Sequence, residues 1–188
     1  MEAKHLDNFA WKPFMQQWNR DLLESEYSSY HVSAEVVRSG WLGYPGATAT
    51  QIAQVEARLG VKLPPSYRSF LEFTNGWGRV NRAIYKLWSV EEVEWFSVRH
   101  QDWIDIWKQE PEPDYEPEAQ AEGVFIQSTL EISDVGDGAI YLLNPQIITP
   151  DGEWEAWFFA NWLPGATIYP SFWEMMQDEH ERFLRLIE

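Results

Sequence analysis

The sequence contains no cysteine among its 188 residues, which excludes disulfide bonds and metal sites built on thiolates. No apolar run approaches the roughly 18 residues of a membrane-spanning helix. The N-terminus, MEAKHLDNFAWKPF, lacks the apolar core of a signal peptide. These absences together predict a soluble, cytoplasmic protein.

Basic residues are also scarce, since 14 Lys and Arg stand against 30 Asp and Glu and give a net charge of −16. A chain this acidic is repelled by nucleic-acid phosphates and by anionic lipid, so we expect neither nucleic acid nor a membrane as a partner. A basic protein would instead be attracted and steered toward it. The alternative is that the acidity only keeps the protein in solution.

The common catalytic and metal-binding motifs are absent as well. The sequence has no G-x-S-x-G elbow, no H-E-x-x-H pair and no P-loop. Its four histidines are scattered, and its carboxylates are too numerous to single out an acid–base pair. The loop at residues 134–138 has neither the spacing nor the closing glutamate of a calcium site. We therefore expect no catalytic residue, no metal and no cofactor.

The most strongly patterned stretch is residues 48–78, which predicts two short helices joined by a tight corner. The first helix is expected to begin at Thr48, which forms a capping box with Gln51, and to end at Gly60. Its apolar positions have the spacing of an amphipathic helix: Ile52, Val55 and Leu59.

The second helix of this hairpin is expected to start at the Pro64-Pro65 corner, because proline suits the first turn of a helix. It is expected to end at Asn75 and Gly76, which both tolerate positive φ. One face carries the predicted core positions Tyr67, Phe70, Leu71 and Thr74.

The flanking segments carry weaker signals. Residues 1–40 predict one helix, at about 13–24, that packs on the rest of the protein. Residues 83–88 predict a strand, and Ser89 with Glu92 predicts a capped helix that runs to Trp107. Residues 109–122 combine three prolines with six acids, which predicts a mobile acidic insert. This insert is either a solvated connector or a loop that engages a basic partner.

The C-terminal third alternates with the period of strands. Turns are predicted at 134–138, 144–145 and 150–152, and the last two strands are expected to form an antiparallel meander. Strands are predicted at 124–126, 130–132, 139–143 and 153–162. A closing helix after Ser171, capped with Glu174, would bury Phe172, Met175, Met176, Phe183, Leu186 and Ile187. The whole pattern predicts an α+β fold, with helices packed on a mostly antiparallel sheet.

Residues 153–162 place large aromatic side chains on both faces of a predicted strand. Two interpretations compete for the second face, which carries Glu153, Glu155, Trp157 and Phe159. Either another element such as the N-terminal helix covers it, or it is an exposed aromatic patch with an acidic rim that binds a protein partner. Trp77, at the end of the helical hairpin, is a further candidate for partner binding.

The motif Leu63-Pro64-Pro65-Ser66-Tyr67, followed by Phe70-Leu71 and Asn75-Gly76, resembles the SUKH superfamily and its Smi/Knr-type branch. The resemblance implies a Smi/Knr-like domain over residues 46–187. Residues 1–40 would then be a helical extension, and 109–122 an insert. Six positions are expected to be structural motif residues without a chemical role: Leu63, Pro64, Tyr67, Phe70, Asn75 and Gly76.

Proteins that look like this are mostly bacterial immunity proteins, which bind and neutralise secreted or contact-delivered toxins that are often nucleases. The resemblance therefore implies a non-catalytic binding module whose partner is a basic toxin domain. Two alternatives stay open, namely a regulatory scaffold with an endogenous partner and, with less support, an unrecognised enzyme.

Overall fold

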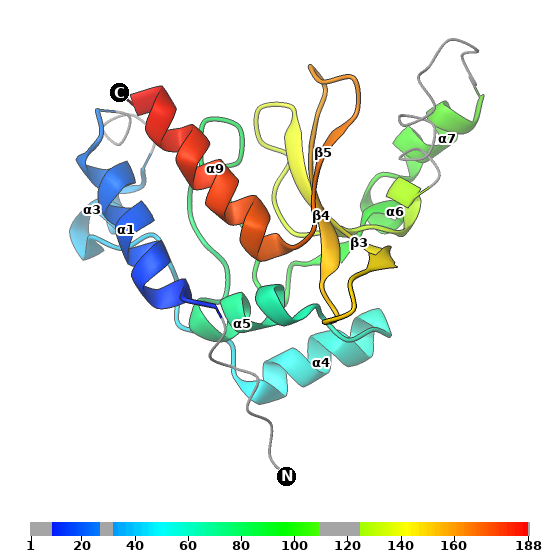
Figure 1. Ribbon diagram of the computed structural model, residues 1–188, viewed down its shortest axis with the longest axis horizontal. Helices are drawn as coiled ribbons and strands as arrows, with labels where there is room; N and C mark the ends of the chain where they lie inside the picture. Colours follow the sequence, from blue (N-terminus) through cyan, green and yellow to red (C-terminus); the bar gives the residue numbers. More distant parts are fainter. Residues whose placement is uncertain (1–8, 27–31, 110–124, 188) are drawn as a thin grey trace.

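A computed structural model describes residues 9–26, 32–109 and 125–187 (Figure 1). Within these residues, five strands form one antiparallel sheet in sequence order. They are β1 (Glu94–Trp95), β2 (Leu130–Glu131), β3 (Ala139–Ile148), β4 (Trp154–Ala160) and β5 (Ala166–Tyr169). The longer helices are α1 (Trp11–Glu24), α4 (Ala49–Leu59), α5 (Pro65–Phe73), α7 (Gln101–Gln109) and α9 (Phe172–Ile187). The predicted α+β class is confirmed.

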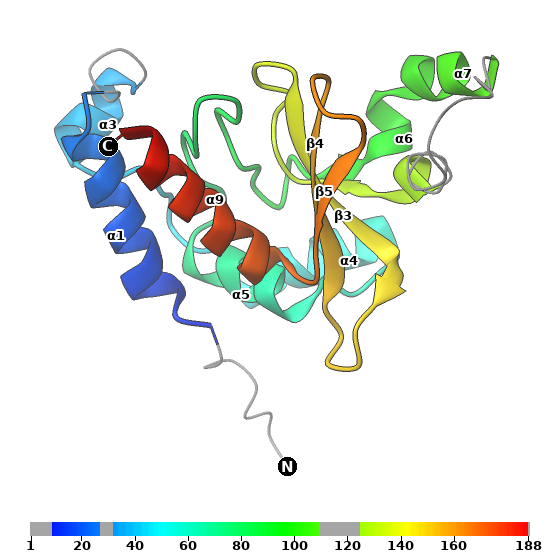
Figure 2. The same ribbon diagram turned by 45° about the horizontal axis from the view of Figure 1, so that its top comes forward.

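Helices cover both faces of the sheet. Alternate strand residues, such as Tyr141 and Phe158, join the main core with residues of α1, α4, α5 and α9. The opposite face carries Leu142 and Trp157, which pack in a second cluster with α6 (Phe96–Arg99), α7 and the 3-10 turn η1 (Ile126–Ser128). Figures 1 and 2 show α1 and α9 on one side of the strands and α6 and α7 on the other.

The predicted helical hairpin is confirmed nearly residue by residue. The Thr48 side chain accepts the Gln51 N–H in a complete capping box, and Gly60 ends α4 with φ 73°. Pro64 caps α5 and Pro65 begins it. The helix ends at Phe73, because Thr74 is extended with φ −145° and does not continue the helical face.

The N-terminal helix packs on the body of the protein, as predicted. It begins at Trp11, two residues before the predicted start. Pro13 then lies in the first turn of the helix, where proline is tolerated. Trp11, Met15, Trp18 and Leu22 are buried in the main core. A short helix, α3 (Ala34–Ser39), was not predicted, because it buries no residue and so carries no apolar pattern.

Two predictions between residues 83 and 107 are wrong. The segment 83–88 is not a strand and has only isolated bridges at Leu87. The helix expected after Ser89 is instead a turn, followed by β1, α6 and α7. His100 separates the two helices with φ −124° and ψ 41°, and its Nε2 lies 2.7 Å from the buried Glu131 carboxylate.

The C-terminal third needs four corrections. The strand predicted at 124–126 is wrong in its described residues, because Phe125 is helical and Ile126 begins η1, and β5 was not predicted. The turn predicted at 144–145 is wrong, because both residues lie inside β3. Pro145 is tolerated there since it sits at a register shift, where a proline needs no ladder hydrogen bond. Leu186 and Ile187 are exposed at the end of α9. Apart from Gln109, the predicted acidic insert lies outside the described residues.

Candidate functional site

One concavity of the described surface is a hollow of about 640 Å³ that Asn75 helps to line. It lies between the start of α4, the end of α5 and the segment that leads to β1. We call it the Asn75 hollow, and its lining consists of Tyr44, Pro45, Gly46, Thr48, Gln51, Asn75, Lys86, Ser89 and Glu92.

One wall is the turn at residues 44–46, which is fixed to the end of α5. The Thr74 hydroxyl accepts the Tyr44 N–H at 2.9 Å and lies 3.1 Å from the Tyr44 carbonyl. The Asn75 N–H donates to the Pro45 carbonyl at 3.2 Å. Gly46 passes so close to the α5 backbone that a Cβ would lie 2.0 Å from the Glu72 carbonyl oxygen. The extended Thr74 therefore holds this wall against the helix.

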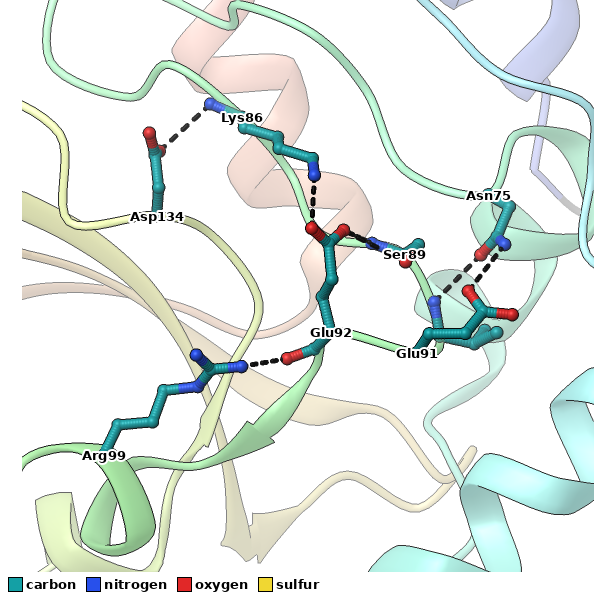
Figure 3. Close-up of polar contacts among 8 residues, drawn as sticks. Asn75, Lys86, Ser89, Glu91, Glu92, Arg99 and Asp134 are labelled. Carbon is teal, nitrogen blue, oxygen red and sulfur yellow. Dashed lines mark hydrogen bonds and ion pairs between the residues drawn. The ribbon is translucent and has the colours of Figure 1, made fainter.

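The opposite wall is a turn that the Glu92 carboxylate closes (Figure 3). Glu92 Oε2 accepts the N–H and the hydroxyl of Ser89 at 3.1 and 3.0 Å. Its other oxygen pairs with Lys86 Nζ, and its carbonyl accepts a hydrogen bond from Arg99. Asp134 fixes the far end of this wall, since its Oδ1 accepts the Lys86 N–H at 3.0 Å.

Asn75 joins the two walls through its side-chain amide. Its Oδ1 accepts the Val90 N–H at 2.9 Å, and its Nδ2 donates to Glu91 Oε2 at 3.2 Å. Gln51 Nε2 of α4 donates to Glu91 Oε1 at 2.9 Å. The exposed Glu91 carboxylate is therefore held at the edge of the hollow by two amides from separate elements. Figure 3 shows the contact with Asn75.

Both carboxylates at the hollow are stabilised as anions. Partial burial opposes the ionisation of Glu92, but hydrogen bonds from Lys86 and Ser89 outweigh it and lower its pKa. Burial likewise opposes ionisation of Glu91, while hydrogen bonds from Gln51 and Asn75 lower its pKa. A carboxyl with a lowered pKa is a poor proton donor and a weak base at neutral pH. Such an arrangement is suited to recognition by charge and hydrogen bonding.

The predicted aromatic patch on β4 is wrong as an exposed surface. Glu153 is 4% exposed and Trp157 is 1% exposed, while Glu155 and Phe159 are half-buried. Trp157 packs under Phe96 and Ile104 in the second cluster. The alternative expectation, that another element covers this face, is confirmed, and the covering elements are α6, α7 and η1 rather than α1.

Trp77 is fully buried too, so the exposed end predicted for the hairpin is wrong at this position. Its backbone bridges Gly43 and Leu87. Of the six predicted motif residues, Leu63, Pro64, Tyr67 and Phe70 are buried, as structural positions should be. Gly76 is buried as well, whereas Asn75 is half-buried and lines the hollow.

The other residues of the hollow were missed as site residues. Ser89 with Glu92 carried a signal, but the pair was interpreted as a helix cap. Glu91 was correctly expected to face solvent, although on a helix that does not exist. Gln51 likewise carried a signal only as a helix cap, and Tyr44 gave no individual signal, because the hollow brings together segments that are far apart in the sequence.

The chain was compared with models of known protein families. A model of the SMI1/KNR4 family (SUKH-1) matches residues 46–178, which is more than half of the chain. The chain belongs to the SUKH-1 family. The matched range includes every residue that lines the Asn75 hollow except Tyr44 and Pro45, and it excludes α1 and α3. A search of curated proteins finds no match.

Two further searches covered only the residues that the structure describes. No helix in that part of the chain is long and apolar enough to cross a membrane. The same residues hold no group of three histidine or carboxylate side chains arranged to bind a metal ion.

Proposed function

We propose that this SUKH-1 protein is a non-catalytic immunity protein, which neutralises a cognate toxin by binding it directly. The observation that carries the proposal is family membership over residues 46–178. The net charge of −16 supports a basic toxin domain, such as that of a nuclease, as the partner.

The geometry of the Asn75 hollow supports a binding role. The two charged residues of its lining, Lys86 and Glu92, pair with each other. Both carboxylates have lowered pKa values, which favours fixed negative charge over proton transfer. We therefore assign partner recognition to this hollow, with the exposed Tyr44 ring and the Glu91 carboxylate at its edge.

A co-expression experiment tests the proposal. The reading frames adjacent to this gene are expressed in a heterologous host, singly and together with this protein, and growth is measured. We expect one neighbouring product to be toxic alone, to be tolerated with this protein, and to co-purify with it in a complex that weakens as salt rises.

Three results would contradict parts of this proposal. No complex and no rescue of growth would overturn the immunity role. A complex with a harmless neighbour would favour a regulatory scaffold. A complex that does not weaken in high salt would remove the electrostatic explanation for the choice of partner.

A further inference from the structure

We infer that the Glu91 carboxylate, at the edge of the Asn75 hollow, pairs with a cationic side chain of the protein partner. This inference rests on the proposed function and names the chemistry that the site recognises. It starts from an imbalance of charge at Glu91, since the side chains that donate hydrogen bonds to it are all neutral: Gln51, Asn75 and Ser89.

Glu91 differs in this respect from the other carboxylates nearby. Glu92 pairs with Lys86, and Glu94 pairs with Arg58 at 2.9 Å. The ion pairs found among the described residues do not include Glu91. Its hydrogen bonds come from neutral groups, namely the Gln51 and Asn75 amides, the Ser89 hydroxyl and its own backbone N–H. An exposed anion is thus present without a counter-charge in the described part of the protein.

The same two amides fix the direction of the carboxylate. The Glu91 side chain is exposed, and a carboxylate can accept the two parallel N–H groups of a guanidinium. Ordering a long exposed side chain costs conformational entropy. Because Gln51 and Asn75 have already ordered Glu91, this cost is not incurred again when a partner binds.

The hollow beside Glu91 can receive the rest of such a side chain. Lys86 is the cation in its lining, and Glu92 neutralises it. The Tyr44 ring is 47% exposed on the same lining, and an aromatic face attracts a cation. A lysine or arginine on an attracted basic protein therefore has both a counter-ion and an apolar contact here.

A competing explanation is that Glu91 acts only within the fold. It lies beside Gln51 in the first turn of α4, where an anion stabilises the helix dipole. Both explanations predict some loss of stability in Glu91→Gln, but only recognition predicts a loss of cation binding. Glu181→Gln is a matched control, because Glu181 is an exposed glutamate on α9, far from the hollow in the sequence.

An NMR titration that needs no partner provides the first test. N-acetyl-arginine methylamide is added to ¹⁵N-labelled protein, with the uncharged citrulline analogue as a control. We expect saturable shifts, with a Kd in the millimolar range, at the Val90 amide and at the side-chain amides of Gln51 and Asn75. Glu181→Gln should keep these shifts and Glu91→Gln should lose them.

The inference is overturned if the wild type shows no such shifts, if citrulline causes the same ones, or if Glu91→Gln retains them. The toxin complex provides the second test, in which Glu91→Gln should weaken binding by about tenfold or more and Glu181→Gln should not. If the wild type rescues growth and Glu91→Gln binds equally tightly, the inference fails while the immunity role stands. If arginine binds but no toxin complex forms, only the immunity role fails.

Discussion

Glu153 caps helix α5 from 87 residues away in the sequence. Its Oε1 accepts the Ser66 N–H and its Oε2 accepts the Ser66 hydroxyl, both at 2.7 Å. Both residues are buried. Since Pro64 and Pro65 supply no N–H at the start of α5, the Ser66 N–H is the first helical donor, and a side chain from the β3–β4 hairpin satisfies it.

Replacing Glu153 with alanine should destabilise the protein by about 2 kcal/mol or more, because a buried N–H and a buried hydroxyl lose their acceptor. Glu153→Gln keeps one acceptor oxygen and should cost less. Chemical denaturation of both variants measures the difference. Equal stability of Glu153→Ala and the wild type would show that this cap is dispensable. A folded Glu153→Ala protein should bind its partner normally, because this residue is not on the surface.

Glu179 gives stability a dependence on pH. It is buried, and its Oε2 accepts hydrogen bonds from Tyr141 and Asn81, each at 2.7 Å. Burial raises its pKa, and this effect outweighs the hydrogen bond from Tyr141 and the attraction of Arg182. Between the ordinary glutamate pKa of about 4.3 and the raised one, the folded state therefore holds more protons than the unfolded state.

The sign follows from this difference in bound protons. The stability that Glu179 contributes is fully present below its unfolded pKa and is lost as pH rises through its folded pKa. Relative to Glu179→Gln, the wild type should lose roughly 1.4 kcal/mol of unfolding free energy for each unit by which the pKa is raised. Urea denaturation of both proteins from about pH 4, just below the ordinary glutamate pKa, to about pH 8 measures this. Parallel pH profiles would contradict the raised pKa.

Local chemistry explains what the sequence could predict. The Thr48 capping box, the stop at Gly60 and the Pro64-Pro65 corner depend on residues within four positions of one another, and all three are present. The strand period at 153–162 also located β4. Each of these features is set by neighbours along the chain.

Long-range partners explain what the sequence could not predict. Glu153 and Trp157 have the alternation of an exposed face, but Ser66 and the α6–α7 segment cover them. The helix expected after Ser89 starts only at Phe96, and it is interrupted at His100. The partner of His100, Glu131, lies 31 residues further along the chain. The Asn75 hollow likewise needs three separate segments to meet, so no single stretch carries its pattern.

Gly76 is a motif residue that packs tightly against the backbone of residues 87–89, and its replacement by alanine should be costly. It has φ 99°, and a Cβ there would lie 2.9 Å from the Leu87 carbonyl oxygen and 3.2 Å from the Ser89 nitrogen. Gly60→Ala is the matched control, because Gly60 also has positive φ but has open space around it. We expect Gly60→Ala to lose about 1 kcal/mol and Gly76→Ala to lose more.

The same pair of variants should differ in the hollow itself. Gly76→Ala displaces the 87–89 backbone, so the Val90 amide resonance should move in ¹⁵N spectra. Gly60→Ala should leave that resonance in place. Equal destabilisation with no change at Val90 would mean that the left-handed backbone alone, and not the close approach to Leu87, requires glycine at position 76.

The N-terminal helix is a part of the core even though the family match begins at residue 46. Trp18 on α1 is fully buried, donates its indole N–H to the Val80 carbonyl at 3.2 Å, and stacks on His180 at 5.0 Å. His180 in turn lies 2.8 Å from Asp21 of α1. The matched region alone would expose the surface that these contacts cover, so we expect it not to fold without α1.

Trp18→Ala should therefore lose about 3–5 kcal/mol of unfolding free energy, as large buried aromatics do on truncation. Val37→Ala is the control on the neighbouring helix α3, where the side chain is 68% exposed and the expected change is within about 0.5 kcal/mol. Thermal and urea unfolding measure both variants. A protein that starts at residue 46 and melts cooperatively near the wild-type temperature would show that α1 is an accessory element. If only the version with α1 folds, the structural domain is larger than the family match.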